Sequence, residues 1–145
     1  TAVADSLPTA DVLVMAAAVA DYRPAAIESS KLKKSGAGLT VELVENPDIL
    51  RAAVAQRRPG QVIVGFAAET GDNHADPLAH AREKFAVKGC DFLVFNQVGG
   101  ELGFESKDNE VVIIGRAGET AVPRASKLEI AATVWNVVIG EWARA

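Results

Sequence analysis

Three uninterrupted apolar runs constrain the fold of this 145-residue chain more than any other feature. They lie within residues 11–18, 61–68 and 90–96, in which the polar residues Asp11, Gln61, Asp91 and Asn96 stand at or next to the ends. Each run has the length of a β-strand rather than of a helix. A strand that is apolar at every position is typical of a parallel sheet with helices on both faces. The sequence therefore predicts an α/β fold with a mainly parallel sheet.

Helix signals occupy the intervals between these runs. Asn46 is a candidate cap, and Pro47 suits the first position of a helix that we expect to end near Gln56. A second helix is predicted from Asp76-Pro77 to Lys88, with Gly89 at its C-terminal cap. Helices between parallel strands supply the crossover connections that such a sheet requires.

The C-terminal third predicts a hairpin and one more helix. Residues 111–114 and 119–123 flank a turn at 116–118, and residues 98–109 form a glycine-rich loop. Ser126 is the predicted cap of the last helix. The apolar face of that helix is expected to comprise Leu128, Ile130, Ala131, Val134, Val138 and Trp142.

Two stretches near the middle of the chain are less regular. Residues 22–26 are expected to be an irregular exit from the first strand, because Pro24 disfavours helix at Arg23. Residues 39–45 alternate apolar and polar side chains, which predicts a half-exposed strand.

Composition and charge exclude several classes of protein. The chain is 49% hydrophobic and 23% charged, which excludes intrinsic disorder and suits a single domain over residues 1–145. A net charge of −4 argues against nucleic-acid or membrane-surface partners. Its one cysteine, Cys90, favours a reducing, cytoplasmic location, and its position before a buried strand suits an inert core thiol.

A ligand site is expected where the parallel strands end, because ligands bind there in open α/β sheets. The segments in question are 17–24, 67–72 and 96–105. Residues 15–20 have small side chains, except for Met15 and Val19. Small side chains permit a ligand to approach the backbone closely, or equally permit a helix to pack tightly on the sheet. Asp21 is a candidate ligand-binding acid or a turn former, and Phe66 either stacks on a base or fills the core.

Basic residues form two further candidates. Lys31, Lys33 and Lys34 precede a Ser/Gly segment, which suits a solvated loop or a flap that carries a cation over a site. Lys84 and Lys88 share one helix face and repel each other unless an anion lies between them. The predicted helix start at 46–48 either caps itself or binds phosphate through its free N–H groups.

Other chemistries lack their signatures. His74 and His80 have no partner at zinc-ligand spacing. The sequence contains neither G-x-S-x-G, nor a Walker loop, nor a G-x-G-x-x-G after a strand.

Six motifs, taken in order, resemble bacterial phosphopantothenoylcysteine synthetase over nearly the whole chain. They are Ala17–Pro24, Lys31–Lys34, Asn46–Ile49, Gly65–Thr70, Ala81–Gly89 and Asp91–Asn96. The resemblance implies a Rossmann-like three-layer fold with a C-terminal antiparallel hairpin. It also implies a CTP- and Mg²⁺-dependent ligase that joins 4′-phosphopantothenate to L-cysteine through an acyl-cytidylate, in coenzyme A biosynthesis. Family members are dimers, and in many bacteria the unit is fused to a decarboxylase domain.

The resemblance also implies roles for individual residues. Lys31 matches the family's essential lysine, Asp21 a CTP-pocket acid that helps to hold the metal, and residues 33–44 a flap over the intermediate. The remaining CTP contacts implied by the resemblance are Met15, Ala16, Ala17, Pro47, Asp48, Ile49, Leu50, Phe66, Lys84 and Lys88.

One departure from the family concerns the start of the chain. The family begins with a strand and a glycine- and serine-rich turn, and nothing here matches them. We therefore expect this chain to be the C-terminal portion of a synthetase unit. The sequence does not decide whether this portion is active by itself. One alternative is a non-catalytic nucleotide-binding module. The other is a nicotinamide-dependent oxidoreductase, which the absence of the glycine fingerprint from the sequence disfavours.

Overall fold

The computed structural model describes residues 2–33, 36, 38–70, 76–98 and 108–143. Its helical elements are α1 (Ala2–Ser6), the 3₁₀ turn η1 (Leu7–Thr9), α2 (Ile49–Gln56), α3 (Pro77–Lys88) and α4 (Lys127–Trp142). Its strands are β1 (Val12–Met15), β2 (Tyr22–Pro24), β3 (Leu43–Glu45), β4 (Val62–Thr70), β5 (Phe92–Val98), β6 (Asp108–Gly115) and β7 (Gly118–Ser126). No helix among the described residues is long and apolar enough to cross a membrane.

The chain divides into two compact units, which are described separately. The first contains Thr1–Ala17 and Ile49–Ala145, and the second contains Ala18–Asp48. The expectation of a single domain stays a prediction.

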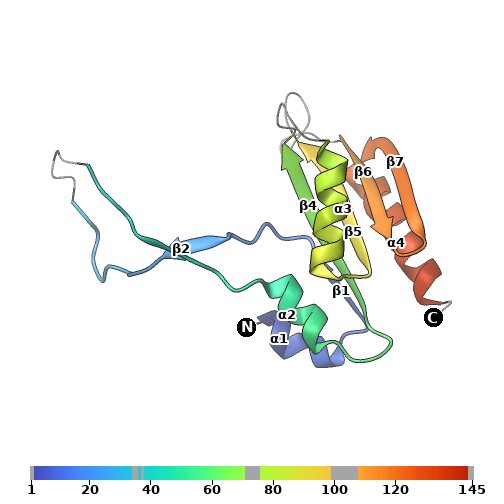
Figure 1. Cartoon of the computed structure of the whole chain (residues 1–145), viewed down its shortest axis with the longest axis horizontal. Helices are drawn as coiled ribbons and strands as arrows, with labels where there is room; N and C mark the ends of the chain where they lie inside the picture. Colours follow the sequence, from blue (N-terminus) through green and yellow to red (C-terminus); the bar gives the residue numbers. More distant parts are fainter. Residues whose placement is uncertain (1, 34–35, 37, 71–75, 99–107, 144–145) are drawn as a thin grey trace. The chain divides into compact units, whose positions relative to one another are not determined.

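The first unit is built on a five-stranded sheet of order β1-β4-β5-β6-β7. β1 and β5 pair in parallel with β4, whereas β6 and β7 continue the sheet in antiparallel fashion (Figure 1). The sequence-based prediction of an α/β fold with a C-terminal antiparallel hairpin is confirmed, and the sheet predicted to be mainly parallel is mixed, with parallel pairing over β1, β4 and β5.

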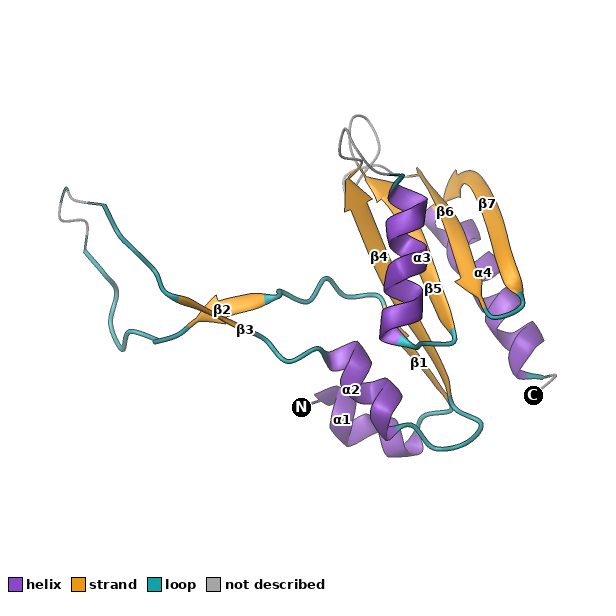
Figure 2. Cartoon of the chain, viewed as in Figure 1, coloured by secondary structure: helices purple, strands orange, loops and turns teal. Residues whose placement is uncertain are grey.

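Helices cover both faces of this sheet (Figure 2). Alternate side chains of β4 point to opposite faces, so that Ile63 packs with α1, α2 and α3 residues and Val64 packs with α4. Ile63, Val64 and Val94 are fully buried, and Leu93 is nearly so. The two layers of core therefore confirm the three-layer arrangement, and β4 and β5 are the doubly covered strands that the apolar runs predicted.

β1 differs from the prediction of a fully buried strand. All four of its residues are only half-buried, because β1 is the outer strand of the sheet and pairs with β4 on one side in the described structure. Its apolar run marks it as a parallel strand, but only its position in the sheet sets its exposure.

The start of α2 also differs from the prediction. The helix begins at Ile49, so Pro47 is not its first residue. Asn46 does not cap it: its side-chain amide donates to the carbonyl oxygen of Ala20 at 2.8 Å, and its Oδ1 accepts from Arg23 at 3.0 Å. The side chain of Asn46 therefore stabilises the segment that contains Ala20 and Arg23, and not the start of α2.

The capping signals of α3 and α4 are confirmed. Asp76 accepts a hydrogen bond from the N–H of Leu78, and Gly89 ends α3 with a positive φ of 68°. Ser126 and Glu129 form a reciprocal capping box at the start of α4. The hydrogen bonds from Ser126 lower the pKa of the Glu129 carboxyl.

The buried face of α4 is narrower than predicted. Ile130, Val134 and Val138 are buried, whereas Leu128 is 81% exposed and Trp142 is 43% exposed. The apolar side chains of α4 point to several sides of the helix, so their spacing alone does not identify the side that packs on the sheet.

The second unit contains the β2–β3 ribbon. Tyr22–Pro24 pairs with Leu43–Glu45, so residues 22–24 form a strand and not the irregular exit that Pro24 suggested. The predicted strand over residues 39–45 is present only in its last three residues, and most of its side chains are exposed. Part of the predicted loop at 98–109 falls on residues 99–107, which lie outside the described residues, as does His74.

The contrast between Ile130 and Leu128 predicts two different mutational effects on one helix. Ile130→Ala should lower the free energy of unfolding by about 2–5 kcal/mol, because it removes a buried side chain. Leu128→Ala, the matched control, should change it by no more than about 0.5 kcal/mol. Urea denaturation followed by circular dichroism measures both, and equal losses would contradict the assignment of the buried face.

The burial of Cys90 predicts slow thiol chemistry. Its side chain is 2% exposed, and burial raises the pKa of the thiol, so the reactive thiolate is scarce. Ellman's reagent at pH 8 should label less than about one tenth of the folded protein within minutes, and one thiol per chain in guanidinium chloride. Rapid labelling of the folded protein would show that this part of the core opens readily.

Candidate functional site

A pocket of about 320 Å³ opens beside the carboxyl end of β1 and the middle of β4, on the face of the sheet that α4 covers. Ala16, which follows β1, and Phe66, from the middle of β4, both line it. They come from motifs 50 residues apart, and the register that pairs Met15 with Gly65 brings them together. The structure thus brings two of the predicted site residues, Ala16 and Phe66, into one pocket, whereas Met15 pairs with Gly65 but does not line it.

Phe66 is not a core residue. It is 39% exposed and lies on the α4 side of the sheet, where it follows Val62 and Val64 in the alternation of β4. An aromatic ring that remains half-exposed in a pocket offers a surface for stacking. Of the two roles considered for Phe66, the structure rules out the core-filling one.

Two polar residues of this pocket were missed by sequence reasoning. Lys127, the first residue of α4, and Asn109, near the start of β6, both line it. Lys127 directly follows the capping Ser126, which is the one sequence signal that could have drawn attention to it. The rest of the wall is apolar and comes mainly from Val14, Val111, Val134 and Trp135.

Leu50 belongs to the opposite face of the sheet. A Cβ added at Gly65 would lie 2.8 Å from the Cδ2 atom of Leu50, so Leu50 packs directly against the β4 backbone. Phe66, the next residue along β4, points the other way. Within the first unit, Ile49 and Leu50 therefore approach β4 from the face that Phe66 does not occupy.

Lys84 and Lys88 both belong to α3, on the same side of the sheet as α2. Lys84 is exposed and Lys88 is half-buried. Their neighbour Arg82 is engaged elsewhere, because its guanidinium makes two hydrogen bonds, of 2.6 and 2.9 Å, to the Glu119 carboxylate. That pair raises the pKa of Arg82 and lowers the pKa of Glu119, so Arg82 serves to tie α3 to β7.

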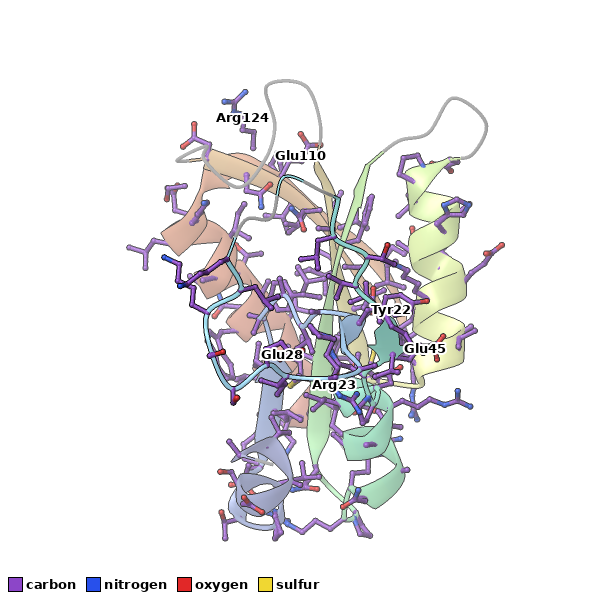
Figure 3. All side chains as sticks on the ribbon, turned by 90° about the vertical axis from the view of Figure 1, so that its left-hand side faces the viewer. Tyr22, Arg23, Glu28, Glu45, Glu110 and Arg124 are labelled. Atoms are coloured by element: carbon purple, nitrogen blue, oxygen red, sulfur yellow. The ribbon has the colours of Figure 1, made fainter. Side chains whose placement is uncertain are left out.

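The remaining predicted residues belong to the second unit. Ala18 to Asp21, Lys31, Pro47 and Asp48 are all exposed. One end of the β2–β3 ribbon is held by the backbone N–H of Asn46, which donates to the Asp21 carbonyl at 2.7 Å. Arg23 donates to the Glu45 carbonyl at 2.8 Å, and both residues are labelled in Figure 3. Lys34 lies outside the described residues.

Asp21 is compatible with a hard divalent cation. Its carboxylate is exposed, and Mg²⁺ is commonly held by one or two carboxylates together with substrate phosphates. No group of three or more His, Cys, Asp or Glu side chains suited to a metal occurs among the described residues. An all-protein metal cage is therefore absent from that part of the chain.

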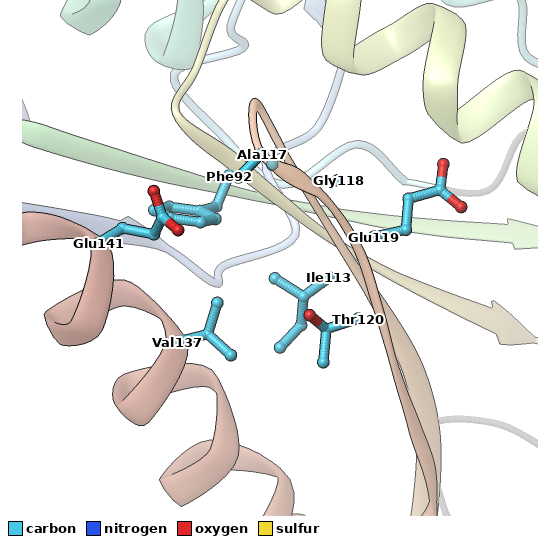
Figure 4. A pocket seen from close by; sticks show the side chains of 9 residues that line it. Phe92, Ile113, Ala117, Gly118, Glu119, Thr120, Val137 and Glu141 are labelled. Carbon is cyan, nitrogen blue, oxygen red and sulfur yellow. The ribbon is translucent and has the colours of Figure 1, made fainter.

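A smaller pocket lies near the β6–β7 turn and includes Glu119, the partner of Arg82 (Figure 4). It has a volume of about 130 Å³ and is lined by Phe92, Val137 and Glu141, among others. It contains none of the predicted site residues.

Comparison with known proteins agrees with the motifs. The model of the DNA/pantothenate metabolism flavoprotein C-terminal domain family matches residues 1–141. The coenzyme A biosynthesis bifunctional protein CoaBC of Mycobacterium bovis is 46% identical over 95% of this chain, and that of Vibrio vulnificus is 42% identical over 81%. The chain spans only 35% and 29% of the lengths of these relatives.

Solved structures share the fold. The C-terminal domain of a CoaBC protein superposes with a TM-score of 0.75 at 24% identity, covering 99% of this chain and 61% of that domain. A Cab2 mutant solved in complex with phosphopantothenate-cysteine gives a TM-score of 0.67 at 18% identity, covering 89% of this chain and 43% of that protein. On the family match and the identity to its relatives, this chain belongs to the DNA/pantothenate metabolism flavoprotein C-terminal domain family.

Proposed function

We propose that this chain forms the nucleotide-binding part of a phosphopantothenate–cysteine ligase of coenzyme A biosynthesis. The observation that supports the proposal most directly is the pocket that Ala16, just after β1, and Phe66 line together on the α4 face of the sheet. The names of the relatives, which are coenzyme A biosynthesis proteins, support the same assignment.

The proposed reaction has two steps. A carboxylate oxygen of 4′-phosphopantothenate attacks the α-phosphorus of CTP, and pyrophosphate leaves. The amine of L-cysteine then attacks the acyl carbon of the acyl-cytidylate, CMP leaves, and loss of a proton from the nitrogen completes the amide. Because both reactants of the first step are anions, cationic groups are required to offset their charge and to stabilise the leaving pyrophosphate.

The nucleotide contacts follow from the chemistry of each residue. The backbone of Met15, Ala16 and Ala17 is accessible to a ligand because the side chains at 16 and 17 are small. Phe66 supplies an exposed ring for stacking on the base. The segment Pro47–Leu50 contacts a different part of the nucleotide from Phe66, because Leu50 packs on the opposite face of β4. Lys127 adds a positive charge to the pocket that Phe66 lines.

The charged groups have separate roles. Lys31 stabilises the acyl-cytidylate and its breakdown, while Lys84 and Lys88 bind the phosphates. Residues 33–44 act as a flap that keeps water from the intermediate. Asp21 contributes a carboxylate to Mg²⁺, which would neutralise phosphate charge when bound.

Exposed apolar side chains in the second unit support a homodimer. Tyr22, Ile27, Leu39 and Leu43 are each more than half exposed on or beside a two-stranded ribbon. An isolated ribbon of two strands is marginally stable in water, and pairing with a second copy would bury this surface. We further propose that the unit is fused to or works with a decarboxylase domain, in keeping with the bifunctional relatives, and is cytoplasmic.

Ligand preference tests the proposal against its alternatives. CTP with Mg²⁺ should bind at least about tenfold more tightly than ATP or NADH, as measured by isothermal titration calorimetry. A preference for NADH would indicate an oxidoreductase. Addition of phosphopantothenate should then release pyrophosphate, and CTP binding without release would identify a non-catalytic nucleotide-binding module.

Lys31 and Lys84 should separate turnover from binding. Lys31→Gln should reduce pyrophosphate release and amide formation by about a hundredfold or more while changing the CTP dissociation constant only a few-fold, because its role concerns the intermediate. Equal losses of binding and turnover would contradict that role.

Lys84→Ala is the complementary variant. It should weaken CTP binding, and the loss should shrink as salt is added, because it removes a phosphate-binding charge. An unchanged dissociation constant at low salt would remove Lys84 from the site.

A further inference from the structure

A third pocket lies at the edge of the sheet where β4 and β5 begin. It has a volume of about 440 Å³, and its charged lining consists of Arg57, Arg58, Arg116 and Asp91. We call it the arginine pocket. Three positive charges and one negative charge give this lining an excess of two positive charges, in a chain whose net charge is −4.

One carboxylate is shared by two of the three guanidinium groups. Arg57 Nη1 lies 2.9 and 2.8 Å from the two oxygens of Asp91, and Arg116 Nη2 lies 3.3 Å from Oδ1. The backbone N–H of Ile63 also donates to Asp91 Oδ2, at 2.9 Å. Asp91 is thus fully engaged and neutralises only one of the two arginines.

Structural needs account for Arg57 but not for Arg116. The Arg57–Asp91 pair is mostly buried and joins the loop after α2 to the start of β5. Arg116 comes from the β6–β7 turn, its side chain is 68% exposed, and the long contact to Asp91 is its one ion pair among the described residues. Exposed ion pairs of this kind contribute little to stability.

Both guanidinium groups retain N–H donors for a ligand. A guanidinium carries five N–H groups, and Arg57 and Arg116 each engage a protein acceptor through a single nitrogen. Arg58 is occupied differently: it donates to the carbonyl oxygens of Pro8 and Ala10 and pairs with Asp11 at 2.9 Å.

Trp142 gives the pocket an aromatic wall. Its indole N–H donates to the carbonyl oxygen of Gly60 at 3.2 Å, which holds the ring beside the loop that carries Arg57 and Arg58. The indole remains 43% exposed. A fixed aromatic surface next to guanidinium groups that retain N–H donors suits an anion that also carries an apolar part.

We propose that the arginine pocket binds the phosphate group of a small phosphorylated molecule. Arg57 and Arg116 donate to the phosphate oxygens, because the planar guanidinium matches phosphate geometry. Trp142 contacts the rest of the ligand. The site is separate from the proposed CTP pocket, since it lies where β4 and β5 begin, whereas the other pocket lies beside the carboxyl end of β1 and the middle of β4, and the two share no lining residue.

The test uses inorganic phosphate as the probe and Trp142 as the reporter. Trp135→Phe leaves Trp142 as the single tryptophan of the chain. Its fluorescence should change saturably with phosphate at pH 8, and potassium chloride at matched ionic strength should not reproduce the change.

Arg116→Gln in that background should weaken phosphate binding by about tenfold, as expected for the loss of a charge-assisted hydrogen bond. The matched control is Arg124→Gln, which removes an exposed arginine paired with Asp108 at 3.7 Å and should leave binding unchanged. Arg116 is preferred to Arg57 because its exposure makes misfolding of the variant a minor concern.

Two results would overturn the proposal: a response to phosphate that Arg116→Gln leaves intact, or one that potassium chloride reproduces. Lys31→Gln distinguishes the two sites, because it should leave the Trp142 response unchanged whether or not the ligase proposal holds.

Discussion

Burial of β4 and β5 on both faces is the constraint on which the rest of the first unit depends. Ile63, Val64, Leu93 and Val94 are at most 2% exposed, so each strand requires an apolar layer on either side. Parallel strands also require crossover connections, and α3 provides the one between β4 and β5. With both faces largely covered, ligands are expected near the ends of the strands.

The two pockets differ in chemistry. An apolar pocket with a half-exposed ring, Phe66, and one cation, Lys127, lies beside the carboxyl end of β1 and the middle of β4. The edge at which β4 and β5 begin has three guanidinium groups around a single carboxylate, Asp91, which already accepts several hydrogen bonds. The first arrangement suits a base and the apolar part of a substrate, whereas the second suits a phosphate. Asp91 connects the sheet to the arginine pocket, because its carboxylate accepts a hydrogen bond from the Ile63 backbone and also positions Arg57.

Local signals predicted most of the elements. The apolar runs identified β4 and β5, and the residues that cap α3 and α4 fixed where those helices begin. Predictions failed where a distant partner intervened. Asn46 bonds to Ala20 and Arg23 instead of capping α2, Tyr22–Pro24 becomes a strand through pairing with β3, and Leu128 faces solvent although its helix is apolar on several sides.

The sequence by itself determined the fold class, the family and the residue types available for binding, because periodicity, caps and ordered motifs depend on near neighbours along the chain. Only the tertiary structure decided which of these residues share a site. Ala16, Phe66 and Lys127 meet because strand register and the docking of α4 bring them together, and Arg57, Asp91 and Arg116 meet for a similar reason. The positions of such groups follow from packing between elements far apart in the chain, and no local pattern encodes them.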